Sequence, residues 1–272
     1  LYIAHRIMNI NKLFDLSGKV VIITGAAGLL GTKYAYGLSQ AGADVVLADL
    51  NQTKCKIIEK KIRKKFATKP MSIKLDLRNK ESILSMTSSI LKEYSKIDVL
   101  INNAAYQGNP KIRSSGFENL ELDVWNQALD VNLTGVFLCC QSIGKQMIKQ
   151  KFGNIINIAS TYGLVGPDQR IYGKSGQNSA IFYATTKSGI LNLTRYLAAY
   201  WQGTGIRVNT FSPGGVENNQ NPDFIKKYSE KTPLGRMAKK DEYIGSIIFL
   251  ASDASSYMTG SNLIVDGGWT SW

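Results

Sequence analysis

Short apolar runs alternate with stretches of helical periodicity along nearly the whole chain. Such runs suit strands that are buried on both faces, as in a parallel sheet, and the stretches between them can form crossover helices. The alternation therefore predicts an α/β fold with a parallel sheet, helices on both of its faces, and ligands at the carboxyl ends of the strands. The expected strands are Lys19–Thr24, Asp44–Asp49, Met71–Leu75, Ile97–Ile101, Asn154–Ala159, Ile206–Phe211 and Asn262–Val265, and the expected helices are 28–41, 54–69, 80–94, 123–149, 181–201 and 241–250.

A glycine-rich turn follows the first strand at once. Gly25, Gly28 and Gly31 bring backbone amides close to a ligand, and the helix that begins there points its positive end at a pyrophosphate. Asp49 ends the next strand, where a carboxylate can accept hydrogen bonds from ribose hydroxyls. These features predict a doubly wound, Rossmann-type dinucleotide site. Asp49 would repel a 2′-phosphate, so NAD(H) is expected as the cofactor and NADP(H) is disfavoured.

A tyrosine and a lysine stand one helical turn apart at Tyr183 and Lys187. A tyrosine has an unperturbed pKa of about 10, so a nearby positive charge is needed to make it a usable base at neutral pH. The pair therefore predicts a proton-transferring phenol. Taken alone, the short pattern also fits an ordinary surface pair on an amphipathic helix.

The chain has 272 residues, of which 44% are hydrophobic, enough for one core. We expect a single domain over 16–272 after an N-terminal extension over 1–15. No apolar run is long enough to cross a bilayer, and the first residues lack the features of a signal peptide, so a cytoplasmic location is expected. Cys139 and Cys140 suit core packing in a reducing compartment. The single histidine, His5, leaves no histidine-based metal site or triad, and no metal is expected.

The formal net charge is +13, and many of the basic residues follow the second strand. Lysines and Arg63 alternate there with Ile58, Ile62 and other apolar residues at helical spacing, which indicates an amphipathic helix with a solvated basic face. Guidance of an anionic substrate is the alternative. Nucleic-acid binding is not expected, because no aromatic residues are interleaved with the lysines.

Several short motifs stand in an order that resembles the short-chain dehydrogenase/reductase family from about Leu16 onward. The segment 161–182, the run 233–237 and the ending 266–269 further resemble a bacterial subgroup linked to flagellin modification and nonulosonic-acid sugar synthesis. The motifs that carry the family resemblance are Thr24–Gly31, Asp76-Leu77, Asn102–Ala105, Asn132, Ser160, Tyr183 with Lys187, and Pro213-Gly214.

The resemblance implies a catalytic role for four residues. Tyr183 would transfer the proton to or from the substrate oxygen, and Ser160 would hydrogen-bond that oxygen. Lys187 would lower the Tyr183 pKa and bind the nicotinamide ribose, and Asn132 would hold a water linking Lys187 to solvent. The implied cofactor-binding residues are Gly25, Gly28, Leu30, Gly31, Asp49, Asp76, Leu77, Asn103, Ala104, Tyr183, Lys187, Pro213, Gly214 and Val216.

The chain departs from the family pattern at three places. Leu29 stands where the family usually has a middle glycine, and Asn218 stands where a threonine is common near the nicotinamide. Ser160 and Tyr183 are 23 positions apart, roughly ten more than is common in the family. The segment 161–182 is therefore expected to form a loop over the substrate mouth.

That segment is rich in hydroxyl, amide and charged groups, which suit sugar hydroxyls or a phosphate better than a fatty chain. Gln169, Arg170 and Asn218 are the expected substrate residues, and Arg170 could grip an anion with two parallel donors. The predicted activity is an NAD(H)-dependent oxidoreductase acting on a polar, carbohydrate-like small molecule. The alternatives are a 3-oxoacyl-carrier reductase using NADPH, a dinucleotide-bound regulatory protein, and, for the loop, a solvated surface.

A homo-oligomer, with a tetramer as the favoured form, is implied by the resemblance. The predicted helices 123–149 and 181–201 agree with this, because apolar residues such as Phe137 and Tyr196 lie outside a single helix face.

Overall fold

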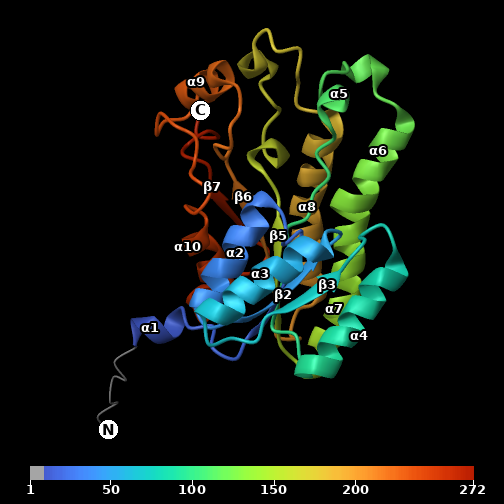
Figure 1. The fold of residues 1–272 in the computed structure, drawn as a ribbon, viewed down its shortest axis with the longest axis vertical. Coiled ribbons are helices and arrows are strands. Elements are labelled where there is room, and N and C mark those ends of the chain that lie inside the picture. The colour runs from blue at the N-terminus through green and yellow to red at the C-terminus, as the bar shows by residue number, and fades with distance from the viewer. Residues whose placement is uncertain (1–8) are drawn as a thin grey trace.

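A computed structural model describes residues 9–272, and their strands form a seven-stranded parallel sheet (Figure 1). The strand order, β3-β2-β1-β4-β5-β6-β7, reverses direction at β1 and β4, as in a doubly wound sheet. The predicted α/β Rossmann-type fold is confirmed. His5 and most of the predicted N-terminal extension lie outside the described residues. The strands are β1 Val20–Thr24, β2 Asp44–Asp49, β3 Met71–Lys74, β4 Val99–Asn102, β5 Gly153–Ile158, β6 Ile206–Pro213 and β7 Asn262–Val265.

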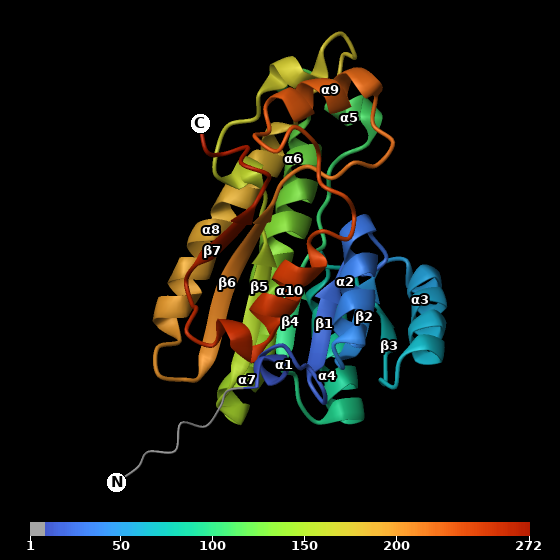
Figure 2. The same cartoon turned by 90° about the vertical axis from the view of Figure 1, so that its left-hand side faces the viewer.

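The helices cover both faces of the sheet, as Figure 2 shows from the side. Between the longer helices lie a π-helical turn at Asp130–Thr134 and short 3-10 turns, two of which fall inside the 161–182 segment. The α-helices are α1 Ile10–Leu13, α2 Leu29–Gln40, α3 Gln52–Lys65, α4 Lys80–Tyr94, α5 Pro110–Arg113, α6 Leu122–Leu129, α7 Gly135–Gln150, α8 Ile181–Tyr200, α9 Pro222–Glu230 and α10 Ile244–Ala251.

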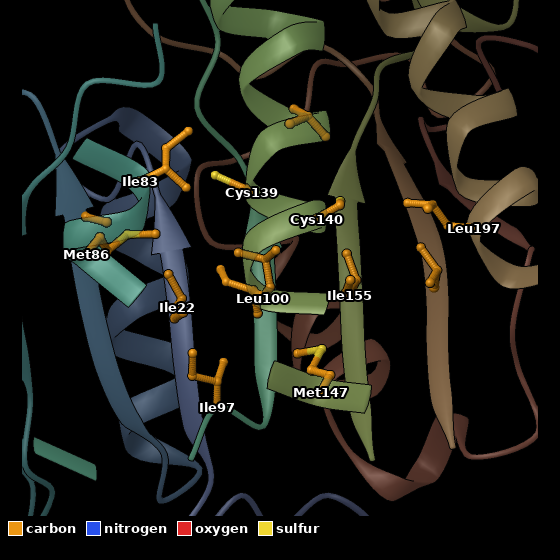
Figure 3. Packing of buried hydrophobic residues seen from close by; sticks show 14 of the residues in the cluster. Ile22, Ile83, Met86, Ile97, Leu100, Cys139, Cys140, Met147, Ile155 and Leu197 are labelled. Atoms are coloured by element: carbon orange, nitrogen blue, oxygen red, sulfur yellow. The ribbon is translucent and has the colours of Figure 1, made fainter. Parts of the chain in front are cut away.

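Alternate residues of each strand supply two separate cores. Ile22 packs with α4 and α7 on one face, whereas Val21 and Ile23 pack with α2 on the other. Figure 3 shows the first core, in which Cys139 and Cys140 lie among aliphatic side chains. Both cysteines are buried and free. The cysteines thus have the packing role expected from the sequence. The alternation of strand residues between two cores is what a sheet covered on both faces requires.

The structure differs from the predicted elements mainly beyond the carboxyl ends of the strands. The single helix expected over 123–149 is divided by the π-helical turn, and α5 and α9 were not predicted. Both are short helices that begin with an asparagine cap and a proline, a local signal that periodicity over a long window does not detect. Within α3, Ile57 is 50% exposed, so it does not belong to the buried apolar face of that helix.

The turns at the carboxyl ends of the strands gather at one end of the molecule, together with α5, α9 and the 161–182 segment (Figures 1 and 2). This end carries almost every residue to which the sequence assigns chemistry. It is therefore the place to look for a site.

Candidate active site

The turn after β1 requires glycine for steric reasons. Gly25 has φ +66°, and a Cβ there would lie 2.7 Å from Ala104 Cα. A Cβ on Gly31 would lie 2.2 Å from the carbonyl oxygen of Gly25. Because real Cβ contacts are never this short, the close approach of α2 to the turn depends on these two residues.

The N-terminus of α2 has open donors. Asparagine side chains cap the helices after β2 and β3, at Asn51 and Asn79, but the N-cap residue of α2, Gly28, offers none. The first amides of a helix lack partners within it, so those of Leu29, Leu30 and Gly31 are free to bind an anion. This arrangement fits a pyrophosphate. Leu29 begins the helix with a 39% exposed side chain, so a side chain fits where the family pattern has glycine.

Asp49 joins two turns with its carboxylate. One oxygen accepts a hydrogen bond from the backbone amide of Ala27 at 3.0 Å, and the other accepts from Asn51 at 2.9 Å. Beside it lies an open hollow of about 520 Å³, lined by Leu50, Asn51, Gln52, Thr53 and Lys74. The hollow lies beyond the carboxyl ends of β2 and β3, where the sequence predicts the adenosine end of a dinucleotide.

The Thr24 hydroxyl ties the end of β1 to the end of β4. It accepts hydrogen bonds from the backbone amides of Asn103 and Ala104, at 3.0 and 3.1 Å. In return, the Asn103 side chain donates to the carbonyls of Thr24 and Gly25, at 3.0 and 3.2 Å. Thr24 stands in a motif that the sequence shows, but no role was predicted for its hydroxyl, although a hydroxyl at a strand end beside a glycine turn is the available signal. Asn103 and Ala104 thus lie against the predicted cofactor turn.

Asp76 and Leu77 follow β3. Arg78 donates to both carboxylate oxygens of Asp76, at 3.1 and 2.8 Å, and this pairing holds the pKa of Asp76 below its usual value. Leu77 is buried, and a Cβ on Gly135 would lie 2.7 Å from its side chain. Asp76 therefore lies at the carboxyl ends of the strands, where the cofactor is predicted, and its carboxylate is already paired with Arg78.

The catalytic candidates Ser160, Tyr183 and Lys187 meet beyond the end of β5. Ser160 follows that strand and is buried, while α8 carries Tyr183 and Lys187. Burial raises the pKa of Tyr183, and the nearby Ser160 hydroxyl acts on it in the opposite direction. The structure thus brings the three predicted side chains together.

Lys187 is 2% exposed, and its ammonium donates to the Ile158 carbonyl at 2.6 Å. Its nitrogen lies 5.7 Å from the centre of the Tyr183 ring. Burial lowers the pKa of Lys187 to about 8. The pKa of the Tyr183 phenol is raised rather than lowered, because burial is the largest influence on it.

Asn132 lies fully buried in the π-helical turn. Its amide oxygen accepts from the backbone amide of Tyr106 at 2.6 Å, and its amide nitrogen donates to the Tyr106 carbonyl at 2.9 Å. The side chain therefore holds the loop after β4 against the helix. Its predicted role in holding a water stays a prediction.

The turn after β6 is held by tyrosine hydroxyls. Tyr243 donates to the Gly214 carbonyl at 3.0 Å, and the Tyr228 hydroxyl accepts from the Gly215 amide at 2.6 Å. Val216 pairs with Ala238 in an isolated parallel bridge. Pro213, the last residue of β6, is buried, and Asn218 donates its backbone amide to Gln220 at 2.6 Å. The predicted nicotinamide turn therefore lies beside α9.

The 161–182 segment is polar at its tip. Arg170, whose side chain is 87% exposed, donates to both carboxylate oxygens of Asp168, which also pairs with Lys231. The Gln169 side chain exchanges hydrogen bonds with the backbone of Ser179. The two predicted substrate residues of this segment thus have partners within the protein.

Beneath this tip the segment packs through aromatic side chains. Tyr162 lies edge-on to Trp269, and Tyr228 stacks on Trp269 with ring centres 4.2 Å apart. Tyr172 packs against Phe224 of α9. This cluster was not foreseen from the sequence, because its members come from three separate segments. It packs the 161–182 segment against α9 and the C-terminal Trp269.

A family model described as enoyl-(acyl carrier protein) reductase matches residues 25–270. The chain belongs to the short-chain dehydrogenase/reductase family. It is 31% identical to the post-translational flagellin modification protein A of Campylobacter coli, over 93% of this chain and 99% of that protein. It is 33% identical to a 3-oxoacyl-(acyl-carrier-protein) reductase of Aquifex aeolicus, over 93% and 98% of the two chains.

A similar solved structure is a gluconate 5-dehydrogenase from Burkholderia cenocepacia in complex with NADP and tartrate. The TM-score is 0.86, the identity is 31%, and the match covers 97% of this chain and 100% of that one. As a member of the family, the chain is a dehydrogenase/reductase acting on CH–OH groups. In residues 9–272, no helix is long and apolar enough to span a membrane, and no cluster of three or more candidate ligands is placed to hold a metal.

Proposed function

We propose that this short-chain dehydrogenase/reductase interconverts a hydroxyl and a ketone on a polar, carbohydrate-like substrate, using NAD(H). The observation that carries the proposal is the meeting of Ser160, Tyr183 and Lys187 at the carboxyl end of β5. An intact set of this kind opposes a purely regulatory, dinucleotide-bound protein.

The chain's own residues divide the proton chemistry among them. Ser160 hydrogen-bonds the substrate oxygen and orients Tyr183, whose hydroxyl gives a proton to a carbonyl or takes one from an alcohol. Lys187 places a positive charge beside the phenol. A bound nicotinamide dinucleotide supplies or accepts the hydride. The amides of Leu30 and Gly31 would hold its pyrophosphate.

Preference for NAD(H) over NADP(H) rests on Asp49. Its carboxylate is fixed by two backbone amides, so it stays where a 2′-phosphate would meet like charge. Family membership does not decide which of the two cofactors is preferred, since the related gluconate 5-dehydrogenase structure contains NADP. Lys74 lines the adjacent hollow and is the cation that could reverse the preference. Comparing kcat/KM for the two cofactors tests this: a higher value with NADP(H) would contradict the proposed role of Asp49.

A polar substrate is supported by the composition of the 161–182 segment, which follows Ser160 and precedes Tyr183. The segment carries hydroxyl, amide and charged groups, and these suit sugar hydroxyls better than a fatty chain. The similarity to flagellin modification protein A supports a role in bacterial surface-sugar synthesis. The similarity to a 3-oxoacyl-(acyl-carrier-protein) reductase, together with the basic helix α3, supports the second candidate, an acyl-carrier reductase using NADPH.

A homo-oligomer, in its favoured form a tetramer, is also proposed. Phe137 of α7 is 45% exposed, and Tyr196 and Tyr200 of α8 are stacked and more than 60% exposed. Apolar surface of this kind on two adjacent helices suits contact with a second copy. Light scattering that showed a stable monomer at micromolar concentration would refute it. Cytoplasmic location likewise stays a proposal.

The test of function is a screen that follows nicotinamide absorbance with NAD(H) and NADP(H). The substrates are polyols, sugar acids, sugar phosphates, nucleotide sugars and a 3-oxoacyl thioester, and Tyr183→Phe is the control. Turnover of a carbohydrate that is lost in the variant supports the proposal. Turnover of the thioester alone, with NADPH, would favour the second candidate.

A further inference from the structure

Arg113 ends the short helix α5 at the side of the site opposite α9 (Figure 1). Its carbonyl accepts a hydrogen bond from the amide of Asn178 at 2.7 Å, and the Asn178 side chain donates to Ser115 at 2.7 Å. The neighbouring Ile112 packs in one apolar cluster with Phe182, the residue before Tyr183. The backbone around Arg113 is therefore joined to the 161–182 segment.

The guanidinium of Arg113 differs from those of Arg78, Arg170 and Arg236. Arg78, Arg170 and Arg236 each hold a carboxylate with two nitrogens. Arg113 is half-buried, its Nε is buried without a hydrogen-bond partner, and no carboxylate within residues 9–272 forms an ion pair with it. A half-buried cation without a counter-charge is costly to maintain, so an anion from outside the chain would stabilise it.

Arg113 is connected electrostatically to Tyr183 through Tyr172. Its positive charge lowers the pKa of Tyr172, against a larger rise from burial, and Tyr172 in turn raises the pKa of Tyr183. Arg113 thus lies within electrostatic reach of Tyr172, and Tyr172 lies within electrostatic reach of Tyr183.

We infer that Arg113 binds an anionic group, a carboxylate or a phosphate, of the substrate whose hydroxyl reacts at Tyr183. The inference rests on the proposed function and narrows its substrate class to sugar acids or sugar phosphates. A guanidinium presents parallel donors to either group. Arg170, the arginine expected from the sequence to do this, already holds Asp168.

The test compares matched ligands of one carbon skeleton: D-glucitol, D-gluconate and D-glucitol 6-phosphate. Their dissociation constants are measured by calorimetry on the NAD-bound wild type, Arg113→Gln, Arg170→Ala and Lys111→Gln. Lys111→Gln is the charge-matched control, because it removes a positive charge from the exposed side of the same short helix. Binding, rather than turnover, is read because it does not need the catalytic step.

Arg113→Gln should weaken binding of one anionic ligand by ten- to a hundredfold, since a charge-assisted hydrogen bond contributes about 1.5–3 kcal/mol. Glucitol and NAD should bind as in the wild type, and Lys111→Gln should change nothing. A loss for D-gluconate means that Arg113 binds a carboxylate, and a loss for D-glucitol 6-phosphate means that it binds a phosphate. Equal losses for glucitol and the anions would mean a structural role and overturn the inference, as would a loss in Arg170→Ala alone or anions that bind no better than glucitol.

Tyr183→Phe separates this inference from the proposed function. If Tyr183→Phe and the wild type both bind an anionic ligand through Arg113 but the wild type turns none over, the proposed reaction fails while the anion site stands. If the wild type turns over neutral sugars and Arg113→Gln does not change that turnover, the proposed reaction stands and the anion site fails.

Discussion

The glycine turn after β1 and the 161–182 segment lie at the same end of the sheet but are held in different ways. In the turn, every contact involves backbone atoms: Gly31 stands against the Gly25 carbonyl, and the Asp49 carboxylate accepts from the amide of Ala27. The 161–182 segment is held by packing between side chains, with Tyr162 against Trp269 from the far end of the sequence. A site held by backbone contacts tolerates little change, whereas one held by side chains can be reshaped one residue at a time.

Tyr183→Phe, at the junction of the two regions, should have the largest effect. Removing one oxygen deletes the proton-transfer group while the ring packing stays, so kcat should fall at least a hundredfold with cofactor affinity unchanged. Steady-state kinetics with a cofactor titration measure both quantities. A variant that binds cofactor normally and retains most of its turnover would contradict the assignment.

Gly31→Ala should have the next largest effect. Its Cβ would lie 2.2 Å from the Gly25 carbonyl, so the turn must move, at a cost of about 1–3 kcal/mol, and cofactor affinity should fall about tenfold. The matched control is Gly166→Ala in the 161–182 segment, where a Cβ meets nothing within 4 Å. Cofactor titration and thermal unfolding compare the two variants. Equal effects would mean that the glycine turn is no less tolerant of change than the 161–182 segment.

Tyr228→Phe tests how the substrate side is held. It leaves the Gly215 amide without its acceptor, so the free energy of unfolding should fall by about 1–2 kcal/mol and the substrate KM should rise several-fold. Tyr257→Phe, on a fully exposed ring, is the control. If urea unfolding gives the same midpoint for both variants, the hydroxyl does not hold this turn.

Lys187 should make the stability depend on pH, and over one pH unit this is the smallest of the four effects. Burial lowers its pKa from 10.5 to about 8, so between those values the unfolded chain binds more protons than the folded one. The free energy of unfolding should therefore rise with pH in this window, by up to about 1 kcal/mol per pH unit, and the cost of the buried charge is fully present below pH 8.

Urea unfolding of the wild type and Lys187→Met between pH 7.5 and about 9.5 isolates the contribution of this group. The variant should lack the rise, because its side chain does not titrate. Parallel curves for the two proteins would mean that Lys187 keeps its ordinary pKa.

The sequence was most informative where local chemistry decides the structure. The sheet, the Gly25–Gly31 turn and the Ser160, Tyr183 and Lys187 set follow from short motifs and period-two burial, and the structure places them as expected. The partners of Asp76 and Arg170 were not foreseen, although Arg78 and Asp168 are only two residues away, because a side-chain pair depends on loop conformation.

The π-helical turn escaped prediction for a different reason. Its residues read as ordinary helix, and within it the Asn132 side chain binds the backbone of Tyr106, 26 positions earlier. Packing between Tyr228 and Trp269 is equally non-local. Contacts of this kind cannot be predicted from a sequence window that is shorter than the separation of the two residues.

The two hydrogen bonds that the Asp49 carboxylate accepts from the amides of Ala27 and Asn51 constrain how this enzyme could evolve or be engineered. A lineage that replaced Asp49 to admit a phosphorylated cofactor would also release two turns, so the replacement would carry a folding defect from the first step. The defect must be repaired elsewhere before the new specificity becomes useful. Cofactor exchange in this protein is therefore a path of several coupled substitutions, and their order matters.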